Sequence, residues 1–209
     1  MIRKALLTAA SAVFMLALSS VARADTVNIV GNSTGSLSTA TVNCTFDDAT
    51  NTFTFTITNT SPFDARITGI GFDIGPGNIN DFSGDDVAGF TFRDDNLGNV
   101  PQFNGTVLDF GFTTGNNFNG GFPNNGIKPG PLNSLTFTVS GDGFGEDLSE
   151  QALCNAIFLR FQRVGTNDDS DVGRAVPGNP VPEPMTMILF GTGLAGVASR
   201  ARRRRRNKE

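Results

Sequence analysis

The stretch Phe53-Thr54-Phe55-Thr56-Ile57-Thr58 alternates strictly between apolar and hydroxyl-bearing side chains. Because successive residues of a β-strand point to opposite faces, this alternation predicts a strand with one face in a core and the other in water. The stretch Leu135-Thr136-Phe137-Thr138-Val139 has the same pattern. The two stretches together indicate an all-β fold built from half-buried strands.

Six further segments are rich in β-branched or aromatic residues and are bounded by turn-forming Gly, Pro and Asn. We therefore expect strands at residues 26–30, 37–46, 67–74, 90–93, 106–113 and 155–164. About eight short strands without a long helical period indicate an antiparallel β-sandwich of jelly-roll or immunoglobulin-like type. Residues 146–153 contain good helix formers and predict one short helix that leads into the last strand.

The first 24 residues have the three parts of a secretory signal peptide. Arg3 and Lys4 precede an apolar stretch, which is followed by the small-residue motif Ala22-Arg23-Ala24. Such a segment is removed on export. We expect a signal helix at residues 1–24 and cleavage before Asp25.

The charge of the exported part, residues 25–180, and the residue types missing from the chain argue against several classes of function. Residues 25–180 contain six basic and 18 acidic side chains, a net charge of −12, which argues against nucleic acid as a partner. The sequence has no His, Trp or Tyr. Without His, the chain cannot build a Ser-His-Asp triad, a Cys-His pair or a His-based zinc site. The sequence therefore predicts a protein that is not an enzyme and has no cofactor.

The two cysteines, Cys44 and Cys154, both lie in the exported part. An even number of cysteines outside the cytoplasm predicts a disulfide, and two free thiols are the alternative.

We assign residues 25–166 to one exported β-domain. Residues 167–180 lack large apolar side chains and contain Pro and Gly, which predicts a linker.

Residues 181–209 combine a short motif, an apolar stretch and a basic end. The motif is Val181-Pro182-Glu183-Pro184, and the apolar stretch covers residues 185–199. Fifteen residues span about 22 Å as a helix, a marginal transmembrane length that snorkelling arginines extend. The stop-transfer residues Arg200, Arg202, Arg203, Arg204, Arg205 and Arg206 place this end in the cytoplasm.

This tail resembles the PEP-CTERM sorting signal of Gram-negative bacteria, which has the same three parts in the same order. The resemblance implies that Pro182, Glu183 and Pro184 are recognised by exosortase, a membrane enzyme thought to cut near the motif. The implied partners are exosortase, the secretion machinery and, as a transient anchor, the inner membrane. The implied destination is the cell surface or extracellular matrix, where exopolysaccharide is a further expected partner in a structural or adhesive role.

Several acidic clusters are candidate calcium sites: Asp47-Asp48, Asp81 with Asp85-Asp86, Asp94-Asp95-Asn96, and Asp168-Asp169-Ser170-Asp171. None has the spacing of an EF-hand loop, and turns whose side chains bind their own backbone explain them more simply. We therefore assign no metal, cofactor or catalytic residue. A calcium-dependent glycan-binding module stays open as the alternative function, followed by a glycan-active enzyme.

Overall fold

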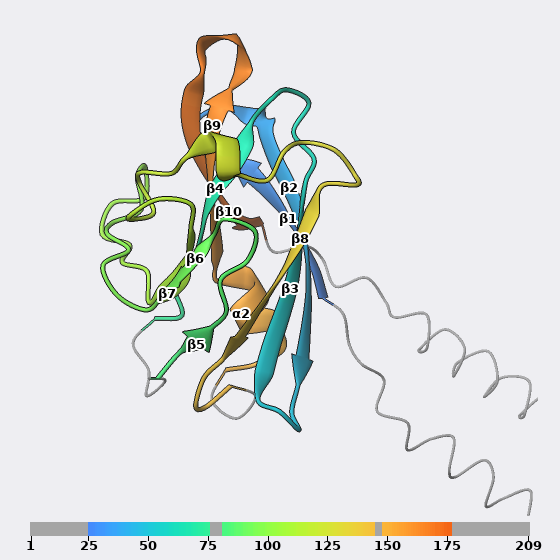
Figure 1. Cartoon of the computed structure of the whole chain (residues 1–209), viewed down its shortest axis with the longest axis vertical. Helices are drawn as coiled ribbons and strands as arrows, with labels where there is room; N and C mark the ends of the chain where they lie inside the picture. Colours follow the sequence, from blue (N-terminus) through green and yellow to red (C-terminus); the bar gives the residue numbers. More distant parts are fainter. Residues whose placement is uncertain (1–24, 76–80, 145–147, 177–209) are drawn as a thin grey trace, which may run out of the picture. The chain divides into compact units, whose positions relative to one another are not determined.

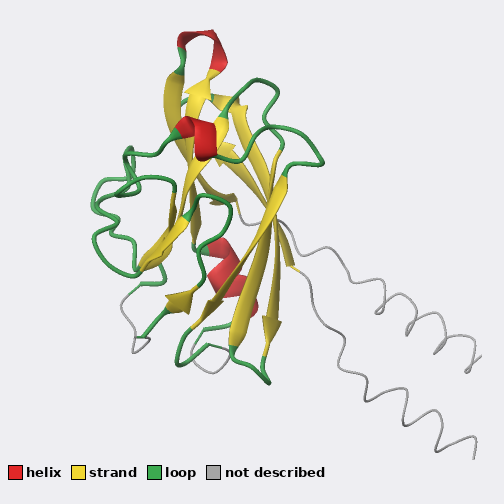
Figure 2. Cartoon of the chain, viewed as in Figure 1, coloured by secondary structure: helices red, strands yellow, loops and turns green. Residues whose placement is uncertain are grey.

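The computed structural model of the protein describes residues 25–75, 81–144 and 148–176. The expected signal helix, the sorting motif, the transmembrane helix and the arginine run lie outside the described residues. The described chain contains ten strands, the α-helix α2 (Glu150–Asn155) and two short 3₁₀ helices, η1 (Pro123–Asn125) and η2 (Gly165–Asn167) (Figure 2).

All ten strands belong to one antiparallel sheet with the order β5-β8-β3-β2-β1-β10-β9-β4-β7-β6. The strands are β1 (Asp25–Gly31), β2 (Gly35–Asp47), β3 (Thr52–Asn59), β4 (Arg66–Phe72), β5 (Ser83–Gly84), β6 (Thr91–Arg93), β7 (Phe110–Thr113), β8 (Ser134–Ser140), β9 (Ile157–Val164) and β10 (Asp169–Val176) (Figure 1).

The sheet curls until its two edges approach each other. A Cβ atom on Gly84 of β5 would lie 2.7 Å from the ring of Phe92 on β6. The all-β, antiparallel prediction is confirmed, but a sandwich of two separate sheets is not what the structure shows. The reason is that β1 pairs with both β2 and β10 and so joins the two halves into one nearly closed, barrel-like sheet.

The eight expected strands are all present, with β7 shorter than predicted, and the expected helix is α2. The assignment of residues 167–180 to a linker is wrong for residues 169–176, which form β10. Val172 and Ala175 of this strand are buried, and five of its eight residues are Gly or have polar or charged side chains. Hydrogen bonding on both sides, to β1 and β9, holds in place a strand whose own apolar content is low.

Phenylalanine supplies most of the largest side chains in the interior. Phe55 of β3 contacts the rings of Phe72 on β4 and Phe112 on β7, with centroid distances of 5.0 and 5.8 Å. It also stacks on Phe137 of β8 at 5.4 Å. Burial of each such ring contributes about 1.5–3 kcal/mol. These contacts join strands from opposite sides of the curled sheet and hold it closed.

A smaller apolar cluster covers the outer face of β9 and β10. Phe158 and Val172 pack there with Leu97, Val100, Leu108 and Phe118 from the long connections on either side of β7. Phe103 adds an edge-on contact to the Phe158 ring at 5.3 Å. These connections therefore shield one side of the sheet from water, whereas the outward side chains of β1, β2, β3 and β8 are partly or fully exposed within the described part of the chain.

The predicted disulfide is confirmed. Cys44 of β2 is bonded to Cys154 of α2, with a Cα–Cα distance of 6.1 Å and a sequence separation of 110 residues. Helix α2 begins after Ser149, whose hydroxyl accepts a hydrogen bond from the nitrogen of Ala152. The bridge ties the helix that precedes β9 to the early strand β2, across a large part of the chain.

Candidate functional site

The outer surface of β1, β2, β3 and β8 is covered by hydroxyl and amide side chains. Residues at alternate positions of these strands point into the core, as Phe53, Phe55 and Ile57 of β3 do. The residues between them point outward. We call this surface the threonine face and define it as Thr26, Asn28, Thr39, Thr41, Asn43, Thr45, Thr52, Thr54, Thr56, Thr58, Ser134, Thr136, Thr138 and Ser140.

Strand register aligns these side chains in rows across the sheet. Thr56 is paired with Asn43 on one side and Thr136 on the other, and Thr26 continues the row on β1. Two hydrogen bonds run along this row, from Thr26 Oγ1 to Asn43 Oδ1 at 2.7 Å and between the hydroxyls of Thr56 and Thr136 at 2.8 Å. Cross-strand pairs of this kind stabilise a sheet by about 0.2–1 kcal/mol each.

The next rows repeat the arrangement. Thr54 pairs with Thr45 and Thr138, and Thr58 pairs with Thr41 and Ser134. Neighbouring strands are about 4.8 Å apart and alternate residues of one strand are about 6.7 Å apart. The threonine face is therefore a regular array of groups that both donate and accept hydrogen bonds.

Asp171 anchors β10 to the turn between β1 and β2. It is fully buried, and its carboxylate accepts hydrogen bonds from the nitrogens of Ser33 (3.0 Å), Thr34 (2.8 Å) and Val172 (2.8 Å). The hydroxyls of Ser33 (2.9 Å) and Thr34 donate to it as well. Burial raises the pKa of Asp171, but the hydrogen bonds from Thr34 and Ser33 outweigh it and hold the pKa below its ordinary value.

The structure thus assigns Asp171 a role that the sequence does not reveal. In the sequence it is the last residue of an acidic cluster, but its buried carboxylate accepts hydrogen bonds from the Ser33–Thr34 turn rather than facing water.

Among residues 25–75, 81–144 and 148–176, no three acidic or cysteine side chains lie close enough together to hold a metal ion.

The carboxylates of other acidic clusters accept hydrogen bonds from residues nearby in the sequence. Asp47 Oδ1 accepts from the nitrogen of Ala49 at 3.0 Å, and Asp86 Oδ1 accepts from the nitrogen of Phe92 at 2.8 Å. Asp95 accepts from the side-chain amide of Asn96 at 2.8 Å. These are the contacts of turn-forming side chains.

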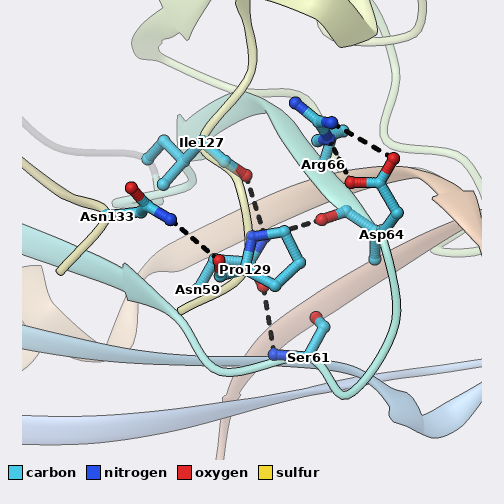
Figure 3. A network of polar contacts seen from close by, with 8 residues as sticks. Asn59, Ser61, Asp64, Arg66, Ile127, Pro129 and Asn133 are labelled. Atoms are coloured by element: carbon cyan, nitrogen blue, oxygen red, sulfur yellow. Dashed lines mark hydrogen bonds and ion pairs between the residues drawn. The ribbon is translucent and has the colours of Figure 1, made fainter. Parts of the chain in front are cut away.

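A second polar network fixes the loop after β3 (Figure 3). Asn59 is fully buried, and its amide nitrogen donates to the carbonyls of Ala65 and Ile127, both at 2.8 Å. Its Oδ1 accepts from the nitrogen of Ser61 at 3.1 Å. Every atom of this amide that can bond is used to hold backbone, so we assign Asn59 a structural role.

Asp64 and Arg66 form an ion pair on the exposed side of the same loop (Figure 3). Two nitrogens of Arg66 donate to the Asp64 carboxylate, at 2.7 and 3.1 Å. The hydrogen bond from Arg66 holds the pKa of Asp64 below its ordinary value. Because Asp64 is exposed, the pair contributes little to stability.

Of the sorting-motif, stop-transfer and disulfide residues that the sequence singles out, Cys44 and Cys154 lie in the described chain, and they are bonded to each other. None of the helices among the described residues has the length and hydrophobicity of a membrane span. The threonine face was not predicted as a site, although its alternating threonines are visible in the sequence, because only strand pairing brings them into rows.

Comparison with known proteins identifies the tail. The family model described as the PEP-CTERM protein-sorting motif matches residues 180–205, which include Val181–Pro184, Arg200 and Arg202–Arg205. No curated protein and no solved structure matches the chain. The match agrees with the order of motif, apolar stretch and basic end: this chain carries a PEP-CTERM protein-sorting motif, which indicates an exported protein that is sorted by exosortase.

Proposed function

We propose that the protein is a structural or adhesive component of the cell surface or extracellular matrix of a Gram-negative bacterium. The observation that carries this proposal is the PEP-CTERM sorting motif at residues 180–205. On this proposal the signal peptide exports the chain, and the tail anchors it briefly in the inner membrane with the β-domain in the periplasm. Exosortase then cleaves near Pro182-Glu183-Pro184 and releases the domain to the surface, in association with exopolysaccharide.

The character of the β-domain supports a non-enzymatic role. Phenylalanine supplies most of the largest side chains in its core, its only two cysteines form one bridge, and the chain has no His. The most strongly held buried carboxylate, Asp171, accepts five hydrogen bonds from protein groups and is committed to the fold. A rigid, cross-linked domain of this kind is suited to durable contact outside the cell.

The sorting part of the proposal is tested by the mass of the mature protein. The full-length chain is expressed in a host with exosortase and in a strain that lacks it, and the protein is recovered from the membrane, surface and medium. With exosortase, we expect a chain that begins at Asp25 and lacks Arg202–Arg206. Without exosortase, the tail should remain and the protein should stay in the membrane fraction.

A matched pair of variants separates motif recognition from charge. Glu183→Gln changes the centre of the motif and should give the uncleaved, membrane-bound form. Glu209→Gln removes the same charge outside the matched residues 180–205 and should be processed normally. Full-length protein on the outer surface with its arginine run intact would contradict the proposed sorting.

A further inference from the structure

The residues that define the threonine face carry no charge, although the exported part of the chain is strongly acidic. Residues 25–180 carry a net charge of −12, yet β1, β2, β3 and β8 contain no Lys, Arg or Glu. Their two charged residues, Asp25 and Asp47, are terminal residues of β1 and β2. A positive or negative charge on a partner would find no oppositely charged side chain on this face. We therefore expect the partner that binds here to be uncharged.

The face also lacks the apolar centre of a protein–protein interface. Of the large hydrophobic side chains exposed in the described chain, only Val30 lies on these four strands, and it is 42% exposed. Phe63, Val107, Phe122 and Leu132 are exposed elsewhere. Stable protein interfaces concentrate aromatic and aliphatic side chains at their centre. This composition therefore argues against a second copy of the chain as the occupant.

What the face offers is a dense set of stiff hydroxyl groups. Threonine is β-branched, so little side-chain freedom is lost when its hydroxyl binds a ligand. The hydroxyls of Thr56 and Thr136 bond each other, whereas those of their neighbours Thr54 and Thr138 have no protein partner among the described residues. Each threonine adds a methyl group that can contact the C–H groups of a sugar ring.

The shape of the surface selects a chain rather than a flat lattice. The four strands span about 14 Å from β1 to β8, and four threonines of β3 extend over about 20 Å. Sheets twist by about 20–25° from strand to strand, so a rigid crystalline surface would lose register within a few rows. A polymer chain can follow one row of hydroxyls across the twist.

We propose that the threonine face binds a neutral polysaccharide, whose hydroxyl groups exchange hydrogen bonds with the rows centred on Thr54, Thr56, Thr136 and Thr138. This inference rests on the proposed function, since it names the partner of an exported domain. It does not depend on sorting for its test, because binding is measured on purified protein.

The test uses native affinity electrophoresis of protein purified after expression of the full-length chain. The probes are hydroxyethyl cellulose, dextran and a galactomannan as neutral polysaccharides, and alginate as an anionic one. Three variants are compared with the parent. One carries Thr54→Val, Thr56→Val, Thr136→Val and Thr138→Val, and the second carries Ser at the same four positions. The third, a control, carries Thr50→Val, Thr91→Val and Thr106→Val, which lie outside the face.

We expect at least one neutral polysaccharide to retard the parent protein. The four-valine variant should bind at least about tenfold more weakly, because valine keeps the shape and strand preference of threonine but removes the hydroxyl. The four-serine variant keeps the hydroxyls and should bind within about threefold of the parent, as should the control. Unchanged melting temperatures would show that all variants are folded.

Three results would overturn the inference: no retardation of the parent by any neutral polysaccharide, equal binding by the four-valine variant, or retardation by alginate alone. A parent protein that sediments as a dimer, while the four-valine variant sediments as a monomer, would instead make the face an interface between copies. Failure of export or cleavage in the host would contradict the proposed function and leave this binding result unaffected.

Discussion

The main-chain nitrogen of Asp25 lies 3.3 Å from Oε1 of Glu150, whose other oxygen accepts from the nitrogen of Phe46 at 3.2 Å. Asp25 is the first residue of β1 and the residue before which we expect signal-peptide cleavage. In the precursor its nitrogen is a neutral amide, and after cleavage it is an α-ammonium group. Processing would therefore turn this contact into a charge-assisted one, beside the Cys44–Cys154 bridge.

We expect the mature protein to be more stable with a free amine at Asp25 than with an acetylated one, by about 0.5–2 kcal/mol, because a charged donor binds a carboxylate more strongly. Urea unfolding of the two forms measures this difference. In a Glu150→Gln background the difference should largely disappear. An equal loss on acetylation in both backgrounds would show that Glu150 is not the partner of the amine.

Removal of the disulfide should destabilise the domain. The Cys44→Ser, Cys154→Ser variant is expected to lose about 2–5 kcal/mol, since the bridge restricts a long segment of the unfolded chain. Denaturant unfolding of the oxidised parent, the reduced parent and the variant checks this. The reduced parent and the variant should agree with each other, and a variant as stable as the oxidised parent would contradict the prediction.

Asp171→Asn should cost about 1–3 kcal/mol at neutral pH, because two backbone nitrogens and two hydroxyls of Ser33 and Thr34 lose a charged acceptor. The control is Asp169→Asn, two residues away on the same strand and exposed. This change should leave stability within about 0.5 kcal/mol of the parent.

The effect of Asp171→Asn should also depend on pH. The folded pKa of Asp171 lies below its ordinary value of 3.8. Because the pKa is lowered by folding, the carboxylate stabilises the fold at pH values above its pKa in the unfolded chain. This contribution is lost as the pH falls through the pKa of Asp171 in the folded protein. The difference between parent and variant should therefore be constant from about pH 5 to 7 and shrink below about pH 4. A difference independent of pH would contradict the role of the charge.

Gly31→Ala should be strongly destabilising, by about 2 kcal/mol or more, because the new Cβ would clash with Oδ2 of Asp171 and lie 2.8 Å from Cβ of Ser38. The carboxylate cannot move aside without losing its hydrogen bonds. In an Asp171→Ala background the same change should cost less, and thermal unfolding of the four proteins in this double-mutant cycle measures the coupling. An equal loss of stability on Gly31→Ala in both backgrounds would show that the new Cβ does not clash with the Asp171 carboxylate.

The strands, the disulfide and the sorting tail could be predicted from the sequence. The strands and the tail depend on neighbouring residues, and the disulfide has only one possible pair of cysteines. The alternation of residues 53–58 is a local consequence of the two-residue period of a strand. The bridge follows from there being only two cysteines, Cys44 and Cys154, in an exported chain. The tail is recognised because its motif, apolar stretch and basic end are contiguous.

Only the tertiary structure decided how these parts are joined. Strand β10 (Asp169–Val176) has few apolar residues and is held in place by β1 and β9 on its two sides, so nothing local predicts it. Its insertion beside β1 turns the expected pair of sheets into one. The same pairing sets the burial of Asp171 and, through the register of β2, β3 and β8, the rows of the threonine face. Register is a property of two strands at once, and a single sequence pattern cannot determine it.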